Sequence, residues 1–205
     1  RRGGAILSFE VYFLPMKPKD FKNPHSWQQR RPFFSDGVLH VPVYYSDYGE
    51  YQFPGWTDVF GNDHPVSVEY CSGNGSWVAA KAAANPHINW VAVEKRFDRV
   101  RKIWSKMKNS NLANLMVVWG EAHTATFHYF PENTVENIYI NFPDPWPKKR
   151  HHKHRLMHPA FVEQCCRILK DEGGLTLVTD DAQYSDFAIA ELRGLSPDEA
   201  REKLI

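Results

Sequence analysis

The chain has 205 residues and a mass of 23.8 kDa, with 25 basic and 24 acidic side chains that give a formal net charge of +1. A hydrophobic fraction of 42% and a charged fraction of 24% exclude a wholly disordered chain, and this length can bury one sizeable core. No stretch approaches the roughly 20 apolar residues that span a bilayer, so the sequence predicts no membrane partner.

The N-terminal residues lack the pattern of a secretory signal peptide, because Glu10 interrupts the apolar run and no small-residue cleavage site follows. The chain has three cysteines, of which Cys165 and Cys166 are adjacent, and this is a poor basis for a disulfide framework. We therefore expect a reducing, cytoplasmic environment. Because Met16 begins a segment that would read well as a start, residues 1–15 are either an upstream extension or part of the native chain.

The first part of the chain, residues 1–62, is rich in proline and aromatic residues and shows no sustained helical period. Short extended pieces such as 38–41 are the only regular candidates there. We expect this part to form an irregular arm that packs on a domain formed by residues 63–205.

From Pro65 onward the pattern alternates between strands and helices. A helical face formed by Phe97, Val100, Trp104 and Met107 illustrates the period. Predicted strands lie at 66–70, 88–93, 112–119, 137–142 and 175–179, and predicted helices at 76–84, 96–108, 161–169, 184–193 and, with a capping pattern, 196–199. This alternation predicts an α/β fold with a mostly parallel sheet and helices on both faces.

Acidic residues follow the ends of several predicted strands. Glu94, Glu121, Asp144 and Asp180 all lie at or just after these ends. Since ligands of parallel α/β sheets bind outside the carboxyl ends of the strands, we expect the sheet to bring these side chains together.

The first motif with chemical meaning is the turn after the first predicted strand, Glu69 to Gly75, which contains Gly73 and Gly75. An ordinary tight turn is one interpretation of this pair, and a ligand-binding turn is the other. A dinucleotide site would have a third glycine, and Glu69 would repel a pyrophosphate, so a nicotinamide-dependent oxidoreductase is disfavoured. S-adenosylmethionine carries a sulfonium and an ammonium and no phosphate, and it suits an acidic pocket.

The second motif is Glu94, which stands 21 residues after Gly73 at the end of the second predicted strand. A carboxylate at this place can accept hydrogen bonds from both hydroxyls of a ribose. Its alternative role is to cap the following helix. The spacing and the position at a strand end favour the ligand role.

The third motif is the segment 141–150, in which Asp144 and Trp146 lie among three prolines that rule out regular structure. It continues into KKRHHKHR at 148–155, which has five fixed cations and no acid. A rigid surface turn with solvated cations is the simplest alternative. A rigid acid beside a dense cationic stretch is typical of a site that binds an anionic polymer and reads one base.

Here the sequence resembles the tRNA (guanine-N7)-methyltransferase family, bacterial type. FPDPWPKKRHHKHRL is similar to that family's signature, and the ordered acids and glycines match over roughly residues 63–182. The resemblance implies a Rossmann-like methyltransferase fold, S-adenosylmethionine as cofactor and tRNA as partner. It implies methyl transfer to N7 of a guanine in the tRNA variable loop, position 46 in standard tRNA numbering.

The resemblance also assigns roles to individual residues. It implies cofactor binding by Glu69, Gly73, Gly75, Glu94 and Glu121, a catalytic and substrate-binding role for Asp144, and substrate binding by Lys148 and Asp180. Contacts with RNA are implied for Lys149, Arg150, His151, His152, Lys153, His154 and Arg155. The chain would act as a monomer or homodimer without an obligatory protein partner.

The sequence departs from the family at three places. Cys71 stands where the family usually has glycine, and Glu121 stands where it commonly has aspartate. No Thr-x-x-Glu element occurs anywhere in the chain, so we expect the C-terminal antiparallel strands to be missing. A non-catalytic tRNA-binding relic of the same fold is therefore the alternative function.

Other chemistries fit less well. The histidines of the basic segment have only the adjacent Cys165 and Cys166 nearby, which is poor spacing for zinc, so we expect no metal. For methyl transfer, guanine N7 carries a lone pair and no proton, so the reaction needs placement and electrostatics more than a base. Asp144 is predicted to stabilise the developing cation, to read the guanine edge, or to do both.

Overall fold

The computed structural model describes residues 15–23 and 26–194. Expectations for residues 1–14 and for the capped helix at 196–199 lie outside the described residues. The strands are β1 (Phe33–Ser35), β2 (Val38–His40), β3 (Val66–Tyr70), β4 (Asn89–Glu94), β5 (Leu115–Trp119), β6 (Val135–Asn141) and β7 (Leu169–Val178). They form one sheet in the order β1-β2-β5-β4-β3-β6-β7, in which only the β1–β2 pair is antiparallel.

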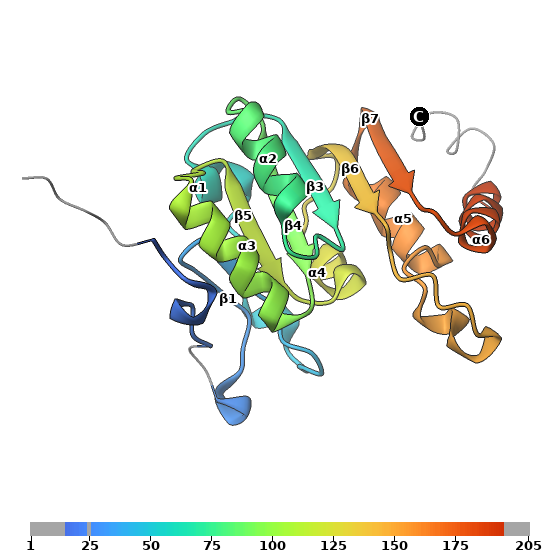
Figure 1. Ribbon diagram of the computed structural model, residues 1–205, viewed down its shortest axis with the longest axis horizontal. Helices are drawn as coiled ribbons and strands as arrows, with labels where there is room; N and C mark the ends of the chain where they lie inside the picture. Colours follow the sequence, from blue (N-terminus) through green and yellow to red (C-terminus); the bar gives the residue numbers. More distant parts are fainter. Residues whose placement is uncertain (1–14, 24–25, 195–205) are drawn as a thin grey trace, which may run out of the picture.

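Helices lie on both faces of this sheet (Figure 1). They are α1 (Trp56–Phe60), α2 (Ser76–Ala84), α3 (Phe97–Asn109), α4 (Ala122–Tyr129), α5 (Pro159–Ile168) and α6 (Ala182–Arg193), with short 3-10 helices η1 (Pro18–Asp20), η2 (Trp27–Gln29), η3 (Tyr48–Glu50) and η4 (Lys149–His154). One core cluster packs α2 and α3 against the sheet, and a second packs α1, α4, α5 and α6 against it. The predicted α/β fold with a mostly parallel sheet is confirmed.

The strand order positions a ligand site. The chain runs from β3 outward to β4 and β5, and then returns to the other side of β3 to form β6 and β7. The order therefore reverses between β3 and β6, and a crevice opens beyond the carboxyl ends of strands at such a switch point. Glu69 on β3 and Asn141 at the end of β6 flank it.

The N-terminal part is more closely integrated than an irregular arm. The extended piece expected at 38–41 forms β2, which pairs with β1 in a hairpin and continues the sheet beside β5. Farther upstream, the carbonyl of Met16 accepts hydrogen bonds from Ser105 Oγ at 2.7 Å and Asn109 Nδ2 at 2.9 Å on α3. The chain is thus tied to the domain from Met16 onward.

Two elements differ from their predictions. Strand β7 begins at Leu169, directly after α5, whereas the predicted strand began at residue 175. The added part contains an irregularity: Leu169 pairs with Val135, and Gly174 already pairs with Asn137. A Cβ at Gly173 would lie 2.9 Å from the carbonyl oxygen of Glu136, so this packing requires glycine. Helix α4 escaped prediction because its buried residues, Ala125, Thr126 and Tyr129, form no clear apolar stripe.

The region after β7 contains α6, as expected near 184–193. Among the residues that the structure describes, no antiparallel strand pair follows β7. In the same residues, no helix combines the length and apolar character needed to cross a lipid bilayer.

Candidate active site at the carboxyl ends of the strands

The turn after β3 adopts the left-handed backbone conformation at three residues. Cys71, Gly73 and Gly75 have φ values of 59°, 55° and 72°. A Cβ at Gly75 would lie 2.6 Å from Ile103 Cγ1, so close packing of α3 fixes this glycine. A Cβ at Gly73 would meet only the Cys71 carbonyl oxygen at 3.9 Å. Open space therefore faces Gly73, the member of the pair that a ligand could approach.

Glu94 fills the structural role that the sequence allowed, and its role toward a ligand stays a prediction. Its side chain is only 4% exposed, Oε2 accepts from the Gly73 N–H at 3.0 Å, and Oε1 accepts from the Arg96 N–H at 2.8 Å. Arg96 is the residue before α3, so Glu94 also supports the start of that helix. Arg99 Nη1 lies 3.7 Å from Oε2. These contacts hold the carboxylate rigidly, and each oxygen keeps a lone pair for a ligand hydroxyl.

Glu69 lies deeper, at 2% exposure. Its Oε1 accepts from Asn141 Nδ2 at 2.9 Å, across the switch point between β3 and β6. Its Oε2 is buried without a hydrogen-bond partner in the described residues. Burial raises the pKa of this carboxyl, the hydrogen bond from Asn141 lowers it, and the Glu94 charge raises it further. A buried acceptor with an open lone pair suits a cationic donor such as an ammonium.

Glu121 occupies a different kind of position. It caps the N-terminus of α4, where its carboxylate accepts from the His123 N–H at 3.1 Å and from the Thr124 N–H at 2.8 Å. The Thr124 hydroxyl donates a third hydrogen bond at 2.9 Å. The predicted ligand is therefore also a structural cap, which explains how glutamate can be accommodated here.

The loop after β6 carries the third motif. It begins with the Phe142 N–H donating to the Val178 carbonyl at 2.8 Å, and both Phe142 and Trp146 have positive φ. The Trp146 ring packs against His151 and His154, with ring centroids 5.6 and 5.3 Å away. Asp144 is exposed on this loop. Ring packing thus holds the loop against the basic segment and leaves Asp144 accessible.

The predicted RNA-binding residues separate by exposure. The side chains of Lys148, Arg150, Lys153 and His154 are exposed, and those of His151 and His152 are half-buried; Lys149 begins η4. Arg155 is placed differently from the expectation. It is 3% exposed, and its Nε donates to the Pro145 carbonyl at 2.9 Å. A guanidinium turned inward in this way has little surface to offer to an RNA phosphate.

A cavity of about 530 Å³ joins these segments. Of the predicted residues, Glu94, Glu121, Asp144, Lys153, His154 and Arg155 line it, together with Cys71 from the turn. Lys148 and Asp180 are exposed and lie outside its lining, and Glu69 lies behind it next to Asn141. The cavity thus connects the turn after β3, the end of β4, the start of α4 and the proline-rich loop.

Several residues of the site were not predicted, and three of them carry polar groups of interest. Arg99 and His158 line the cavity, and Asn141 orients Glu69. Helical cations usually face solvent, so nothing in the sequence separated Arg99 from the other cations of α3. His158 precedes α5, where its Nδ1 accepts from the Phe161 N–H at 3.3 Å, and burial lowers its pKa. Asn141 was part of the quoted motif, but only the adjacency of β3 and β6 reveals its partner.

Comparison with known proteins shows the family of this chain. Residues 63–199 match a family model described as "Putative methyltransferase". The tRNA (guanine-N(7)-)-methyltransferase of Chlamydia felis is 51% identical over 183 residues, which are 89% of this chain and 82% of the relative. The enzyme of the same name from Geobacillus sp. is 34% identical over 78% of this chain and 73% of its own length. The chain belongs to the tRNA (guanine-N(7)-)-methyltransferase family.

Membership of this methyltransferase family confirms the activity predicted from the sequence. The protein is an S-adenosylmethionine-dependent enzyme that methylates guanine N7 in tRNA. A solved structure titled "Structure of an Antibiotic Related Methyltransferase" has the same fold, with a TM-score of 0.50 at 17% identity over 66% of this chain and 71% of that chain. The Rossmann-like methyltransferase fold is thereby confirmed.

The residues present fit the cofactor of a methyltransferase. The unpartnered Oε2 of Glu69 provides a buried acceptor for an ammonium, and Glu94 provides a fixed carboxylate for hydroxyls. Cys71 lies among these acids, and burial and the charges of Glu94 and Asp144 raise the pKa of its thiol to about 12. Cys71 is therefore a neutral thiol at physiological pH and adds no further negative charge.

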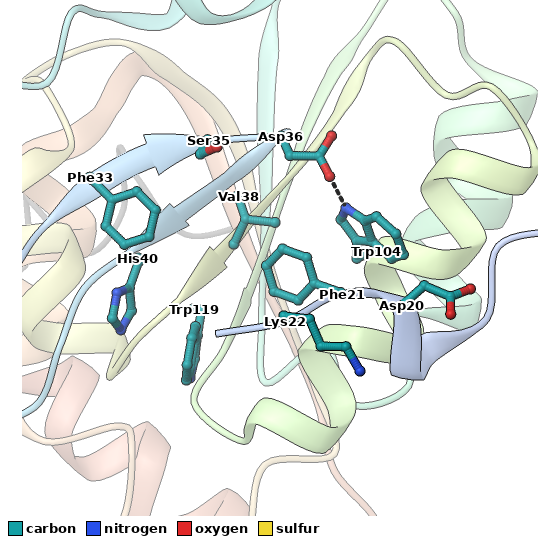
Figure 2. A pocket seen from close by; sticks show the side chains of 10 residues that line it. All are labelled: Asp20, Phe21, Lys22, Phe33, Ser35, Asp36, Val38, His40, Trp104 and Trp119. Atoms are coloured by element: carbon teal, nitrogen blue, oxygen red, sulfur yellow. Dashed lines mark hydrogen bonds between the residues drawn. The ribbon is translucent and has the colours of Figure 1, made fainter. Parts of the chain in front are cut away.

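A second cavity, of about 210 Å³, lies on the α3 side of the methyltransferase, between the N-terminal segment and β2 and β5 (Figure 2). Its walls include Phe21, Phe33, Trp104 and Trp119, and Asp36 accepts a hydrogen bond from Trp104 Nε1 at 2.9 Å. It is lined by none of the predicted site residues. Its aromatic character reflects packing of the N-terminal segment on α3, where the Phe21 ring lies 5.2 Å from the Trp104 ring between centroids.

Proposed function

We propose that this methyltransferase modifies the guanine at position 46 in the tRNA variable loop and that Asp144 acts directly on that guanine. The observation that carries the proposal is the shared cavity: Asp144 lines it together with Glu94, and the rigid proline-rich loop sets Asp144 opposite the strand ends. The variable loop is a suitable target because its bases can be unstacked and read on their edges by a protein.

The proposed division of labour follows from the positions of the acids. S-adenosylmethionine supplies a methyl group on a cationic sulfur. Glu94 would accept hydrogen bonds from its ribose hydroxyls, and Glu69 would accept one from its ammonium. Gly73 would allow close approach of the backbone. Glu121 would act at the cofactor end of the cavity from the first turn of α4, with its cap geometry intact.

On the guanine side, no general base is required, because N7 carries no proton. Asp144 would accept from the guanine N1–H and the exocyclic amine, and its charge would stabilise the ring as it becomes cationic. Lys148 and Asp180 would contact the substrate from the exposed edge of the site. Arg150 and Lys153, both exposed on η4, would neutralise phosphates of the tRNA backbone.

The test is methyl transfer from radiolabelled S-adenosylmethionine to an unmodified tRNA, followed by digestion and mapping of the labelled nucleotide. We expect 7-methylguanosine in the variable loop. A matched tRNA with adenosine at that position should accept no label. Label at another guanine would overturn the assignment of position 46, and label on the adenosine variant would overturn the role of Asp144 in reading guanine.

The alternative of a non-catalytic relic rested on Cys71 and on the absent Thr-x-x-Glu element. The geometry favours the enzyme, because Cys71 adopts the left-handed conformation of the turn and the Gly73–Glu94 hydrogen bond forms beside it. Calorimetric titration separates the two alternatives: an enzyme binds S-adenosylmethionine, and a relic binds tRNA alone. We further propose a cytoplasmic monomer or homodimer, which analytical ultracentrifugation with and without tRNA would distinguish.

A further inference from the structure

Arg155 is the one cation of the basic segment that the described structure buries, and its contacts are directed at the loop that carries Asp144. Its Nε donates to the carbonyl of Pro145 at 2.9 Å, one residue beyond Asp144. Its own N–H donates to the His152 carbonyl at 3.0 Å and closes η4. Arg155 therefore links the C-terminal end of η4 to Pro145 in the proline-rich loop.

The guanidinium of Arg155 also packs on two rings of α6. It lies 4.7 Å from the centroid of Phe187 and 5.6 Å from that of Tyr184. Tyr184 is fully buried, and its hydroxyl oxygen accepts from the Met157 N–H at 3.4 Å. The buried charge of the guanidinium is thus stabilised by the two aromatic faces and by the carbonyl that accepts from Nε.

Helix α6 is in turn fixed to the end of β7. Asp181 caps the helix by accepting from the Tyr184 N–H at 2.8 Å, and its own N–H donates to Thr179 Oγ1 at 3.2 Å. The Phe142 N–H donates to the Val178 carbonyl at 2.8 Å, so the loop starts from this same strand end. A continuous set of contacts thus runs from β7 through α6 and Arg155 to Pro145, next to Asp144.

We propose that Arg155 is a positioning residue that fixes Asp144 in the cavity through this set of contacts, and that it does not bind RNA phosphate. We call this set of four contacting residues, Pro145, Arg155, Tyr184 and Phe187, the α6 clamp. Its effect on the reaction depends on the proposed role of Asp144. Because a small misplacement of a catalytic group can cost up to about 100-fold in rate, loosening the clamp should lower turnover at saturating tRNA.

The decisive variant is Arg155→Lys, which keeps the charge and loses the planar fork. The clamp predicts that kcat at saturating tRNA falls roughly 10- to 100-fold, while the dissociation constant for S-adenosylmethionine stays within about twofold. A phosphate contact predicts nearly unchanged kcat, because lysine also neutralises a phosphate. Unchanged kcat in Arg155→Lys would therefore overturn the proposal.

Salt dependence gives an independent readout. Arg155→Met removes the charge. If Arg155 does not contact phosphate, the slope of the logarithm of the tRNA binding constant against the logarithm of the salt concentration should not change. Lys153→Met is the matched control, because Lys153 is exposed two residues away; its slope should shrink by about 0.7–0.9. An equal change of slope in Arg155→Met would overturn the proposal. If Arg155→Met does not fold, Phe187→Leu tests the same clamp with every cation retained, and unchanged kcat there would count equally against it.

The proposal can fail separately from the role of Asp144. If Asp144→Asn loses turnover and both Arg155→Lys and Phe187→Leu retain it, the clamp is wrong and the proposed function stands. If Asp144→Asn retains turnover, the role of Asp144 is wrong and the clamp loses its catalytic meaning. The melting temperature of each variant, measured with cofactor, shows whether lost turnover is accompanied by lost folding.

Discussion

The strand ends and the proline-rich loop with its basic segment hold their charged groups in opposite ways. On the strand side, Glu69 and Glu94 are almost fully buried and are held by backbone and amide hydrogen bonds. On the loop side, Asp144, Arg150 and Lys153 are exposed on a segment stiffened by prolines and ring packing. Arg155 is the exception on that side, since it is buried and braces the loop.

This difference matches the sizes of the two substrates. A small cationic cofactor can be enclosed, so buried acids with preset geometry gain strength from the low local dielectric. A tRNA remains largely outside the protein, so its phosphates require cations that reach solvent and act mainly through counterion release. Variants on the two sides should therefore separate cofactor affinity from tRNA affinity.

The largest effect is expected for Asp144→Asn, on the loop side. The change is nearly isosteric and should preserve folding and cofactor binding, while methyl transfer falls by about 10²–10³-fold. The amide would also place a donor against the donor edge of guanine, which adds a mismatch of roughly 1–3 kcal/mol. Single-turnover transfer of labelled methyl measures this, and a rate within threefold of wild type would remove Asp144 from the mechanism.

On the strand side, Glu94→Ala should weaken S-adenosylmethionine binding by roughly 1.5–3 kcal/mol, the usual contribution of hydrogen bonds to a charged group. It should leave tRNA affinity unchanged, because Glu94 is only 4% exposed and offers little surface to a tRNA. Calorimetry measures the affinity for the cofactor, and filter binding measures the affinity for tRNA. Wild-type cofactor affinity in this variant would show that Glu94 serves only to hold the turn at Gly73 and the start of α3.

A smaller, salt-dependent effect is expected when both Arg150 and Lys153 are replaced by alanine. If each meets one phosphate, the slope of log K against log salt should shrink by roughly 1.4–1.8. Cofactor affinity should not change. Titration of tRNA at several salt concentrations measures the slope, and an unaltered slope would mean that the exposed cations of η4 merely face solvent.

The smallest effect concerns stability. Burial raises the pKa of Glu69, so this group contributes stability below its unfolded pKa that is lost as pH rises through its higher folded pKa. Glu69→Gln should therefore match the wild type in acid and become the more stable protein near neutral pH, while binding the cofactor more weakly. Melting curves of the free proteins from about pH 4 to about pH 8 test this. If Glu69→Gln were less stable than wild type near neutral pH, the Glu69 carboxylate could not be a destabilising, unpartnered charge.

The sequence predicted the elements whose pattern is local. The face of α3 and the strands β3 to β6 follow from hydrophobic periodicity, and the acids at strand ends follow from the parallel topology. Local pattern could not reveal the contact between Glu69 and Asn141, because these two residues are 72 positions apart in the sequence. It also could not separate Arg155 from its basic neighbours, since burial of one cation depends on Phe187 in a helix formed later in the chain.

The proposed reaction is methyl transfer to N7 of the guanine at position 46 of tRNA. The most direct measurement compares two tRNAs, identical except that one carries 7-deazaguanine at that position, which keeps the pairing edge and lacks the N7 lone pair. With labelled S-adenosylmethionine, the guanine tRNA should take up one methyl group per molecule and the 7-deaza tRNA none, although both should bind equally well. Equal labelling of the two tRNAs would contradict the claim, because the methyl group would then be going to another atom.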